Sequence, residues 1–322
     1  MQPIFLFSLP RAGSTLAQRI LGAHQEIATA TEPWLLLPFL YALKEHGAYA
    51  EYNHAAAALA LKDFCARLPQ GQDDYRQELR QLALRLYEKA ARRPARYFLD
   101  KTPRYHLVVE EVIALFPDAK HVFLWRNPLA VVASVIETFG RGKWNLYEFK
   151  VDLFDGLENL LAAYGQCKDR AYALRYEDLV ADGPTALKGL LAYLDLPYDG
   201  ELLESFAKVD LHGRLGDYTG AKQYTQLTTE PLDKWKTVLR NPLRRRWARR
   251  YLRWIGPERL ALMGYSLEQL LGDLDRIPCS ARRLCSDMWR IAYGVPYQLL
   301  EPQLIKGKLR LLRQWHKVHP YY

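Results

Sequence analysis

The sequence predicts an α/β fold in which a parallel β-sheet is flanked by helices. Short apolar runs rich in β-forming residues alternate along the chain with longer stretches of helical periodicity. The first run passes through a tight, glycine-containing turn directly into a helix, as at the start of many α/β nucleotide-binding folds. The clearest run, residues 121–125, is almost entirely apolar and closes on a polar pair, which is typical of a strand buried in a parallel sheet.

The chain opens with a strand at residues 4–7, a turn at 8–13 and a helix at 14–21, whose Leu16, Ile20 and Ala23 fall on one face. The other expected elements follow in chain order: strands at 27–31, 97–99, 121–125 and 171–174; helices at 34–43 and within 54–93; a helix between 103 and 117; and mostly helical structure from 184 to 271. Residues 1–277 are expected to form the α/β domain. The Arg-, Trp- and Tyr-rich residues 278–322 are expected to form a helical C-terminal extension.

The amino-acid composition narrows the range of possible functions but does not identify one. The chain has 322 residues, 49% hydrophobic and 25% charged, which is ordinary for a globular protein. The formal net charge of +9 favours an anionic partner, such as a nucleotide, nucleic acid, acidic glycan or anionic lipid. The four cysteines are scattered without metal-site spacing, so reduced structural thiols and no metal are expected. No signal peptide or membrane-spanning run is evident, so a cytoplasmic location is expected.

The turn before the first helix predicts a binding site for a phosphate-type group. Backbone N–H groups at a helix N-terminus converge there, and the helix dipole favours an anion. Gly13 permits close approach, Ser14 and Thr15 add hydroxyl donors, and Arg11 adds a charge with forked donors. We expect residues Arg11, Ala12, Gly13, Ser14 and Thr15 to bind the ligand.

A P-loop kinase is the obvious alternative for this loop, and two departures argue against it. Ser8 stands where the kinase motif has its first glycine, and Ser14 replaces the lysine. The strand at 121–125 ends in Arg126, where a kinase would carry an aspartate to help hold magnesium. The site is therefore expected to neutralise its ligand with protein cations.

The two elements together resemble the phosphoadenosine-phosphosulfate-dependent sulfotransferases, especially the branch with the protein-tyrosine and many bacterial enzymes. The family pattern P-R-[SA]-G-[ST]-[ST]-L after a strand is similar to FLFSLPRAGSTL at 5–16. The family's strand followed by Arg-[DN], with Ser eight residues after the Arg, corresponds to Arg126, Asn127 and Ser134. The resemblance implies a P-loop-like nucleotide-binding sulfotransferase fold. It also implies that the loop holds the 5′-phosphosulfate and that Arg126 and Ser134 grip the 3′-phosphate of 3′-phosphoadenosine-5′-phosphosulfate.

Further stretches resemble the same family. Residues 99–103 (LDKTP) are similar to the segment whose Lys, here Lys101, assists transfer, and 175–179 (RYEDL) to the element whose Tyr, here Tyr176, contacts the nucleotide. Residues 232–235 (LDKW) resemble a late segment whose Lys, here Lys234, reaches the 3′-phosphate, and Thr219 matches a serine donor there.

The general base is expected to be Glu32, which follows Arg11 at the spacing of the base in the tyrosine-sulfating branch. Many cytosolic members carry Lys in place of Arg11 and a catalytic His. Here His106 is spaced differently, so it is the reserve candidate. Purely structural interpretations stay open for several residues. Lys101 can be a solvated side chain, His121 a hydrogen-bonded structural histidine, and the arginines at 244–246 and 249–250 a solvated helix face.

The expected reaction is in-line, metal-independent sulfuryl transfer to an acceptor hydroxyl. Glu32 would remove the hydroxyl proton, while Arg11, Lys101 and the loop N–H groups would stabilise the developing charge. The acceptor is open among small molecules, glycans, lipids and peptides, and so is the oligomeric state; no nucleic-acid partner is expected. A P-loop-type kinase for a small molecule or nucleoside, and a non-catalytic nucleotide- or polyanion-binding module, remain as alternatives.

The C-terminal extension contains a basic amphipathic pattern. Lys306, Arg310, Arg313 and Lys317 fall on one helical face, and the opposite half carries apolar residues such as Trp315. Such a helix can lie on an anionic membrane surface, or it can dock its apolar half on the protein's own core. Docking is the commoner outcome for terminal helices, and both readings stay open.

Overall fold

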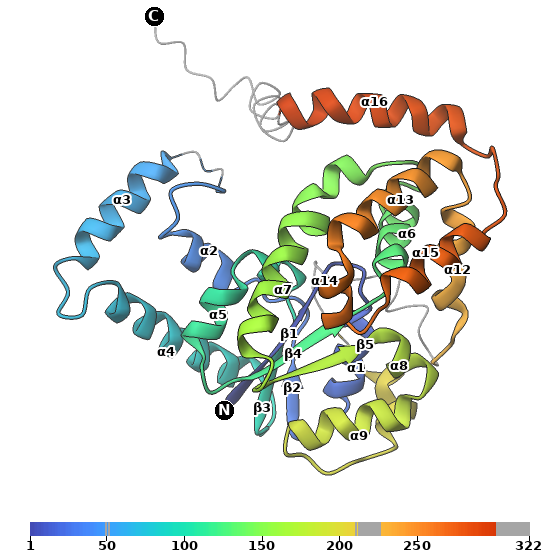
Figure 1. The fold of residues 1–322 in the computed structure, drawn as a ribbon. Helices are drawn as coiled ribbons and strands as arrows, with labels where there is room; N and C mark the ends of the chain where they lie inside the picture. Colours follow the sequence, from blue (N-terminus) through green and yellow to red (C-terminus); the bar gives the residue numbers. More distant parts are fainter. Residues whose placement is uncertain (49, 51, 210, 212–226, 301–322) are drawn as a thin grey trace, which may run out of the picture.

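A computed structural model describes residues 1–48, 50, 52–209, 211 and 227–300. Its centre is a five-stranded, fully parallel sheet in the order β2-β3-β1-β4-β5 (Figure 1). The strands are β1 Gln2–Ser8, β2 Ile27–Thr29, β3 Tyr97–Asp100, β4 Lys120–Trp125 and β5 Ala171–Arg175. The predicted α/β class and all five predicted strands are confirmed; β2 ends two residues earlier than expected.

The register brings the carboxyl ends of the strands to one edge of the sheet. Phe5 of β1 lies opposite both Asp100 and His121, and Ser8 lies opposite Leu124. Trp125 at the end of β4 pairs with Arg175 at the end of β5. The residues that follow β1, β3, β4 and β5 are therefore neighbours, and this edge is where parallel α/β sheets bind their ligands.

Alternate residues of β1 face two separate hydrophobic layers, as the pleat requires. Ile4 and Leu6 pack among α1 and the α8–α10 region, whereas Phe5 and Phe7 pack among the remaining helices on the other face. The first layer contains α1 (Ser14–Gly22), α8 (Tyr176–Ala181), α9 (Gly183–Tyr193) and α10 (Leu202–Ser205). The second contains α2 (Leu36–Tyr41), α4 (Gln72–Ala90), α5 (Val109–Leu115), α6 (Pro128–Thr138), α7 (Gly156–Cys167), α12 (Glu230–Val238), α13 (Pro242–Ile255), α14 (Pro257–Leu262) and α15 (Leu267–Arg276).

One helix prediction is corrected in detail. The expected helix between residues 103 and 117 is divided into a 3₁₀ turn, η1 (Pro103–Leu107), and α5, because Val108 between them has an extended φ of −141°. The prediction of helices within 54–93 is confirmed: they are α3 (His54–Cys65) and α4, separated by a glycine-containing turn. The region expected to be mostly helical after residue 184 contains α9, α10, the 3₁₀ turn η4 (Phe206–Lys208) and α12 to α15. Residues 210 and 212–226 lie outside the described residues.

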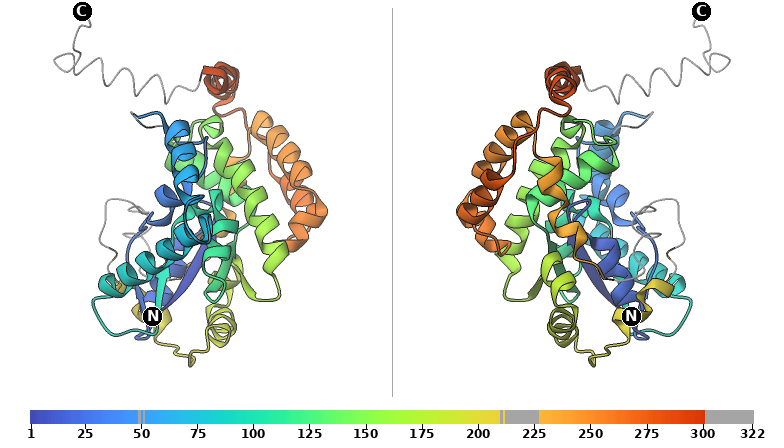
Figure 2. Two further views of the ribbon diagram at one scale, coloured as in Figure 1. Left: turned by 90° about the vertical axis from the view of Figure 1, so that its left-hand side faces the viewer. Right: turned by 90° about the vertical axis from the view of Figure 1, so that its right-hand side faces the viewer.

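The described part of the expected C-terminal extension contains α16 (Leu284–Leu300), which lies at the rim of the molecule on the side away from the N-terminus (Figures 1 and 2). Its inner side packs against α13 and a short 3₁₀ turn, η2 (Leu146–Phe149). A π-helical segment, η3 (Val151–Asp155), follows η2. The predicted boundary at residue 277 stays a prediction, and the basic residues at 306–317 lie outside the described residues.

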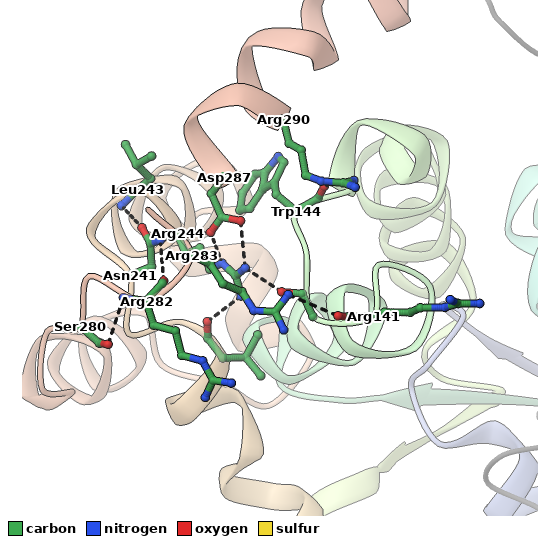
Figure 3. A network of polar contacts seen from close by, with 12 residues as sticks. Arg141, Trp144, Asn241, Leu243, Arg244, Ser280, Arg282, Arg283, Asp287 and Arg290 are labelled. Atoms are coloured by element: carbon green, nitrogen blue, oxygen red, sulfur yellow. Dashed lines mark hydrogen bonds and ion pairs between the residues drawn. The ribbon is translucent and has the colours of Figure 1, made fainter. Parts of the chain in front are cut away.

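A buried ion pair fastens the start of α16 to α13. Arg244 donates from Nε to Asp287 Oδ2 (2.6 Å) and from Nη2 to Asp287 Oδ1 (3.0 Å), and both side chains are almost fully buried (Figure 3). The expectation of a solvated arginine face is therefore wrong for Arg244, because a carboxylate 43 residues later in the chain holds it inside. Within the described ranges, no helix has the length and apolarity that crossing a bilayer requires.

Candidate active site

The loop between β1 and α1 has a backbone that only a glycine fits at one point. Gly13 is the N-cap of α1 with φ of +94°, and a Cβ there would lie 2.3 Å from the ring of Tyr176. Arg11 also has positive φ, at +69°, and Ala12 closes the turn by donating its N–H to Leu9 O (3.2 Å). Ser14 and Thr15, in the first turn of α1, are buried. The loop is thus a tight turn that leads into a helix N-terminus at the carboxyl edge of the sheet.

Four predicted ligand-binding residues from three strand ends lie together here. Arg11 Nε donates to Ser134 Oγ on α6 (3.1 Å), and Arg126 Nη1 donates to the carbonyl of Arg11 (2.9 Å). The guanidinium carbon of Arg126 lies 4.3 Å from the centroid of the Tyr176 ring. Tyr176 is therefore in contact with Arg126 and also with the backbone of Gly13. This network connects the loop with the ends of β4 and β5.

A second cluster joins Glu32, Lys101 and Thr15. Lys101 Nζ donates to Glu32 Oε1 (2.7 Å) and to Thr15 Oγ1 (3.4 Å), and Trp34 Nε1 donates to the other carboxylate oxygen of Glu32 (3.2 Å). The side chain of Lys101 is 1% exposed, so the reading of a solvated lysine is wrong. The ammonium group lies between the candidate base and the first turn of α1.

Asp100, next to Lys101 in sequence, is the centre of a buried network that sequence reasoning missed. It accepts hydrogen bonds from Tyr87 (2.7 Å), Tyr105 (3.0 Å) and Thr102 (2.9 Å). Burial raises the pKa of Asp100 to about 6, although these three hydrogen bonds and Lys101 oppose the rise. The adjacent motif pointed to Lys101, but Tyr87 comes from α4 and no sequence signal connects it with Asp100.

His106, the reserve candidate base, has a different set of partners. Its Nε2 lies 2.8 Å from Asp152 Oδ1, and Asp152 also pairs with Arg104 (3.1 Å). The ring is fully buried and leaves no room for a side chain at Gly156, whose Cβ would lie 2.6 Å from His106 Nδ1. The structure brings Glu32, rather than His106, into contact with Lys101.

The remaining predicted residues lie on or near α12. Lys234 lines the same cavity as Arg126 and pairs with Glu230 on its own helix (3.0 Å). Arg126 Nη2 approaches the carbonyl of Pro231 (3.4 Å), which ties β4 to α12. Thr219 lies outside the described residues.

Glu177 is a supporting residue that the sequence analysis passed over, although it stands in the quoted RYEDL stretch. Its Oε1 accepts the N–H of Asn127 (2.9 Å), and its Oε2 accepts the hydroxyl of Tyr265 (2.5 Å). Burial and the neighbouring Glu177 carboxylate raise the pKa of Tyr265. Asn127 in turn caps α6 by accepting the N–H of Leu129 (2.9 Å). Glu177 therefore fixes the turn that carries Arg126.

A cavity of about 910 Å³ opens between α6 and α12 and reaches Arg11, Arg126 and Ser134. We call it the cationic cavity, because its lining contains seven cationic side chains and two carboxylates. The cations are Arg11, Arg126, Lys234, Arg240, Arg244, Arg282 and Arg283, and the carboxylates are Glu137 and Glu230. Among the residues that the structure describes, no group of three or more His, Cys, Asp or Glu side chains is arranged to hold a metal ion. The arrangement suits a ligand with more than one anionic group.

Comparisons with known proteins agree on one family. The model described as "Sulfotransferase family" matches residues 3–200. Nodulation protein NoeE of Sinorhizobium fredii is 36% identical over 137 residues, which are 42% of this chain and 31% of that protein. Protein-tyrosine sulfotransferase of Drosophila melanogaster is 26% identical over 208 residues, or 63% of this chain and 40% of that protein. The chain thus aligns with only about a third of the length of these curated relatives.

Two solved structures share the fold. The sulfotransferase domain from the olefin synthase of Synechococcus PCC 7002 superposes with a TM-score of 0.53 at 26% identity, covering 73% of this chain and 87% of that domain. The sulfotransferase domain from the curacin biosynthetic pathway superposes with a TM-score of 0.51 at 24% identity, covering 73% of this chain and 90% of that domain.

Proposed function

Because the chain belongs to the sulfotransferase family, we propose that it transfers a sulfuryl group from 3′-phosphoadenosine-5′-phosphosulfate to an acceptor hydroxyl. The observation that carries the proposal is the joint position of the two clusters. The cationic Arg11–Arg126–Ser134 network and the Glu32–Lys101–Thr15 cluster meet at one turn, the loop that begins α1. One side of that turn supplies cations for a bisphosphorylated nucleotide, and the other supplies a carboxylate beside a buried ammonium.

The residues present suit such a donor. The first turn of α1, with Gly13, Ser14 and Thr15, provides N–H and hydroxyl donors for the 5′-phosphosulfate. Arg126, Ser134 and Lys234, which line the cationic cavity, provide donors for the 3′-phosphate. The ring of Tyr176 packs against both the loop, at Gly13, and the guanidinium of Arg126, and so fixes their relative positions. Fixing the nucleotide at two anionic ends orients the sulfur toward the acceptor, a positioning effect.

In this proposal Glu32 acts as the general base. Its carboxylate accepts hydrogen bonds from Lys101 and Trp34, which hold it in place, and it would take the proton of the acceptor hydroxyl. Lys101 and Arg11 stabilise the negative charge that develops on the sulfuryl and bridging oxygens. Each well-placed donor of this kind contributes about 3–4 kcal/mol in comparable oxyanion sites. Lys101, in contact with both Glu32 and Thr15, connects the base to the loop.

Transfer assays with labelled donor test the function directly. We would offer small phenols, sugars, lipids and tyrosine-containing peptides as acceptors, the last because one relative is named a protein-tyrosine sulfotransferase. Product should form in the presence of EDTA, and adenosine 3′,5′-bisphosphate should bind far more tightly than ATP without magnesium. A strict magnesium requirement with ATP preference would establish the kinase alternative instead. Binding of the bisphosphate without transfer to any acceptor class would favour a non-catalytic module.

We also propose an interaction partner: the C-terminal region makes peripheral contact with an anionic membrane. On α16, Met288, Trp289 and Val295 are 62%, 74% and 62% exposed. The two charged residues of this helix, Asp287 and Arg290, instead contact Arg244 and the carbonyl of Trp144. In sequence, α16 is followed by the basic residues at 306–317, whose charge complements anionic lipid. An interfacial helix would bring the site to a lipid-borne acceptor; a cytoplasmic location stays a prediction.

A further inference from the structure

We propose that Arg240, Arg282 and Arg283 form a second anion-binding subsite, for a phosphate or sulfate group, at the outer end of the cationic cavity. The inference rests on the proposed function to the extent that it takes this cavity as the donor site. Arg240 follows α12, and Arg282 and Arg283 precede α16. All three lie beyond residue 200, where the family match ends. They line the same cavity as Arg126 and Ser134.

The first support is an excess of positive charge. Across the described residues, no carboxylate lies within 4.0 Å of Arg240, Arg282 or Arg283, whereas neighbouring Arg245 and Arg249 both pair with Asp275. Of the two carboxylates that line the cavity, Glu230 is paired with Lys234. Clustered cations repel one another, and an anion bound between them adds attractive interactions that offset this repulsion.

Glu137, the second carboxylate that lines the cavity, lies beside Arg283. Both side chains approach Gly142. A Cβ added to Gly142 would lie 3.1 Å from Glu137 Oε1 and 3.0 Å from Arg283 Nη2. Among the described residues, Glu137 is the one lining carboxylate without an ion pair, whereas the subsite contributes three guanidinium groups. Glu137 is also one helical turn after Ser134 on α6, so Arg283 approaches the cavity one turn away from the proposed 3′-phosphate donors.

The second support is that the chain holds these arginines in a fixed arrangement. Arg283 has φ of +63°, and its Nη1 donates to the carbonyl of Arg141 (3.3 Å). The carbonyl of Arg282 accepts from Asn241 Nδ2 (3.2 Å), and Ser280 N donates to the carbonyl of Arg240 (3.1 Å). In Figure 3 the guanidinium of Arg282 points away from the Arg244–Asp287 pair. The carbonyl of Arg282 is therefore held by a hydrogen bond, while its guanidinium group has no ion pair among the described residues.

Asp287 is a positioning residue for the subsite. It accepts from Arg244 and from Asn241 Nδ2 (3.1 Å), and its N–H donates to the carbonyl of Arg283 (2.8 Å). Arg244 Nη2 also donates to the carbonyl of Gly142 (2.9 Å). The buried pair therefore joins the segment of Arg282 and Arg283 to α13 and to the turn after α6, which contribute Arg244 and Gly142 to the lining of the cavity.

The phosphate or sulfate can come from the donor nucleotide or from a separate anionic ligand, and calorimetry on the full chain separates the two sources. We would compare the wild type with Arg282→Ala/Arg283→Ala in binding adenosine 3′,5′-bisphosphate, AMP and sodium sulfate at fixed ionic strength. Arg276→Ala is the control, because Arg276 is 82% exposed and pairs with Asp273 on its own helix. A fall of about tenfold or more in bisphosphate affinity, with AMP affinity unchanged, assigns the subsite to the nucleotide.

Unchanged bisphosphate affinity, with sulfate binding to the bisphosphate-loaded protein lost, assigns the subsite to a separate anion. No change in either titration overturns the proposal. If the wild type binds no bisphosphate, the proposed function fails, yet sulfate binding to the nucleotide-free protein still tests the subsite. Asp287→Asn should lower the same affinity that Arg282→Ala/Arg283→Ala lowers, whether for the bisphosphate or for sulfate. Asp287→Glu should restore part of that affinity. If Asp287→Asn lowers bisphosphate and AMP affinity equally, the positioning role is overturned.

Discussion

Lys101 Nζ lies 2.7 Å from Glu32 Oε1, and the ammonium is sealed from solvent although the two residues are 69 positions apart. Glu32 follows β2 and Lys101 follows β3, neighbouring strands at the edge of the sheet. The ion pair is therefore a direct product of strand order. It places the proposed base and one proposed charge-stabilising group in a fixed relationship beside Thr15.

Glu32→Gln should reduce sulfuryl transfer by roughly 10²–10⁴-fold, because the amide cannot accept the hydroxyl proton. Binding of adenosine 3′,5′-bisphosphate should change little, since Glu32 lies outside the cationic cavity. Lys101→Met and Arg11→Ala should each lower turnover by about 10²–10³-fold through loss of charge stabilisation. Steady-state assays with labelled donor provide the measurement, and Glu78→Gln on the exposed side of α4 is the matched control. Full activity of Glu32→Gln would eliminate Glu32 as the base.

Arg126→Ala should weaken binding of adenosine 3′,5′-bisphosphate about ten- to a hundredfold and weaken AMP binding far less. The reason is that a charge-assisted hydrogen bond contributes roughly 1.5–3 kcal/mol. Arg126 also supports the carbonyl of Arg11, so Arg126→Lys serves as a second variant and should recover part of the affinity. Exposed Arg250→Ala should behave as wild type. Equal losses for both nucleotides would contradict the 3′-phosphate assignment.

Two buried groups should give the unfolding free energy opposite pH dependences. Burial raises the pKa of Asp100 from 3.8 to about 6, so the folded state holds the proton more tightly and this contribution is lost as pH rises through 6. Burial, aided by Arg170, lowers the pKa of His121 from 6.5 to about 4, so its contribution is present above pH 6.5 and lost as pH falls toward 4. Each amounts to at most about 3 kcal/mol, and the two largely cancel between pH 4 and 6.

Single variants should reveal the pH dependence that each group gives to the unfolding free energy, which urea unfolding at several pH values measures. Asp100→Asn should leave a protein that loses stability on acidification below pH 6.5. His121→Phe should leave one that loses stability as pH rises from 4 to 6. The phenyl ring suits the site, because the imidazole packs on Phe5 and Phe7. Identical pH slopes in both variants and the wild type would exclude these groups as the titrating ones.

Anionic vesicles should sediment the full chain, and truncation after Pro302 or the change Trp289→Glu should weaken that binding. The truncation removes the basic residues at 306–317, and the glutamate replaces Trp289, whose side chain is highly exposed on α16. Phe64→Glu is the control, because Phe64 is similarly exposed on α3. Equal binding by all variants would remove the membrane role, and insolubility of the truncated chain would support docking on the protein's own core.

The local pattern of apolar and turn-forming residues was sufficient to predict the strands of the sheet and the loop between β1 and α1. Apolar runs such as residues 121–125 predicted strands correctly, because a strand buried on both faces leaves a continuous apolar signature. The burial of Lys101 and of Arg244 was not predictable in the same way. Each depends on a carboxylate far away in sequence, Glu32 or Asp287, and only the folded topology shows which carboxylate it is.

The satisfied histidine expected at His121 is a comparable case. The residue is structural, but within the described part of the chain neither ring nitrogen has a hydrogen-bond partner. A strand of alternating residues places the ring beside aromatic side chains, and sequence spacing alone does not reveal that its two nitrogens lack hydrogen-bond partners among the described residues. The division around Val108 reflects a backbone dihedral angle that residue propensities do not encode.

The position of β1 in the sheet also sets an order of events during synthesis. β1 lies between β3 and β4, yet it leaves the ribosome before either, since these partners begin at Tyr97 and Lys120. At about 5–20 residues per second, its apolar residues wait on the order of ten seconds for their first strand partner. During that interval Ile4, Phe5, Leu6 and Phe7 form an unpaired, aggregation-prone segment. Nascent chains arrested before residue 97 should therefore bind chaperones through this segment, and chains arrested after β4 should not.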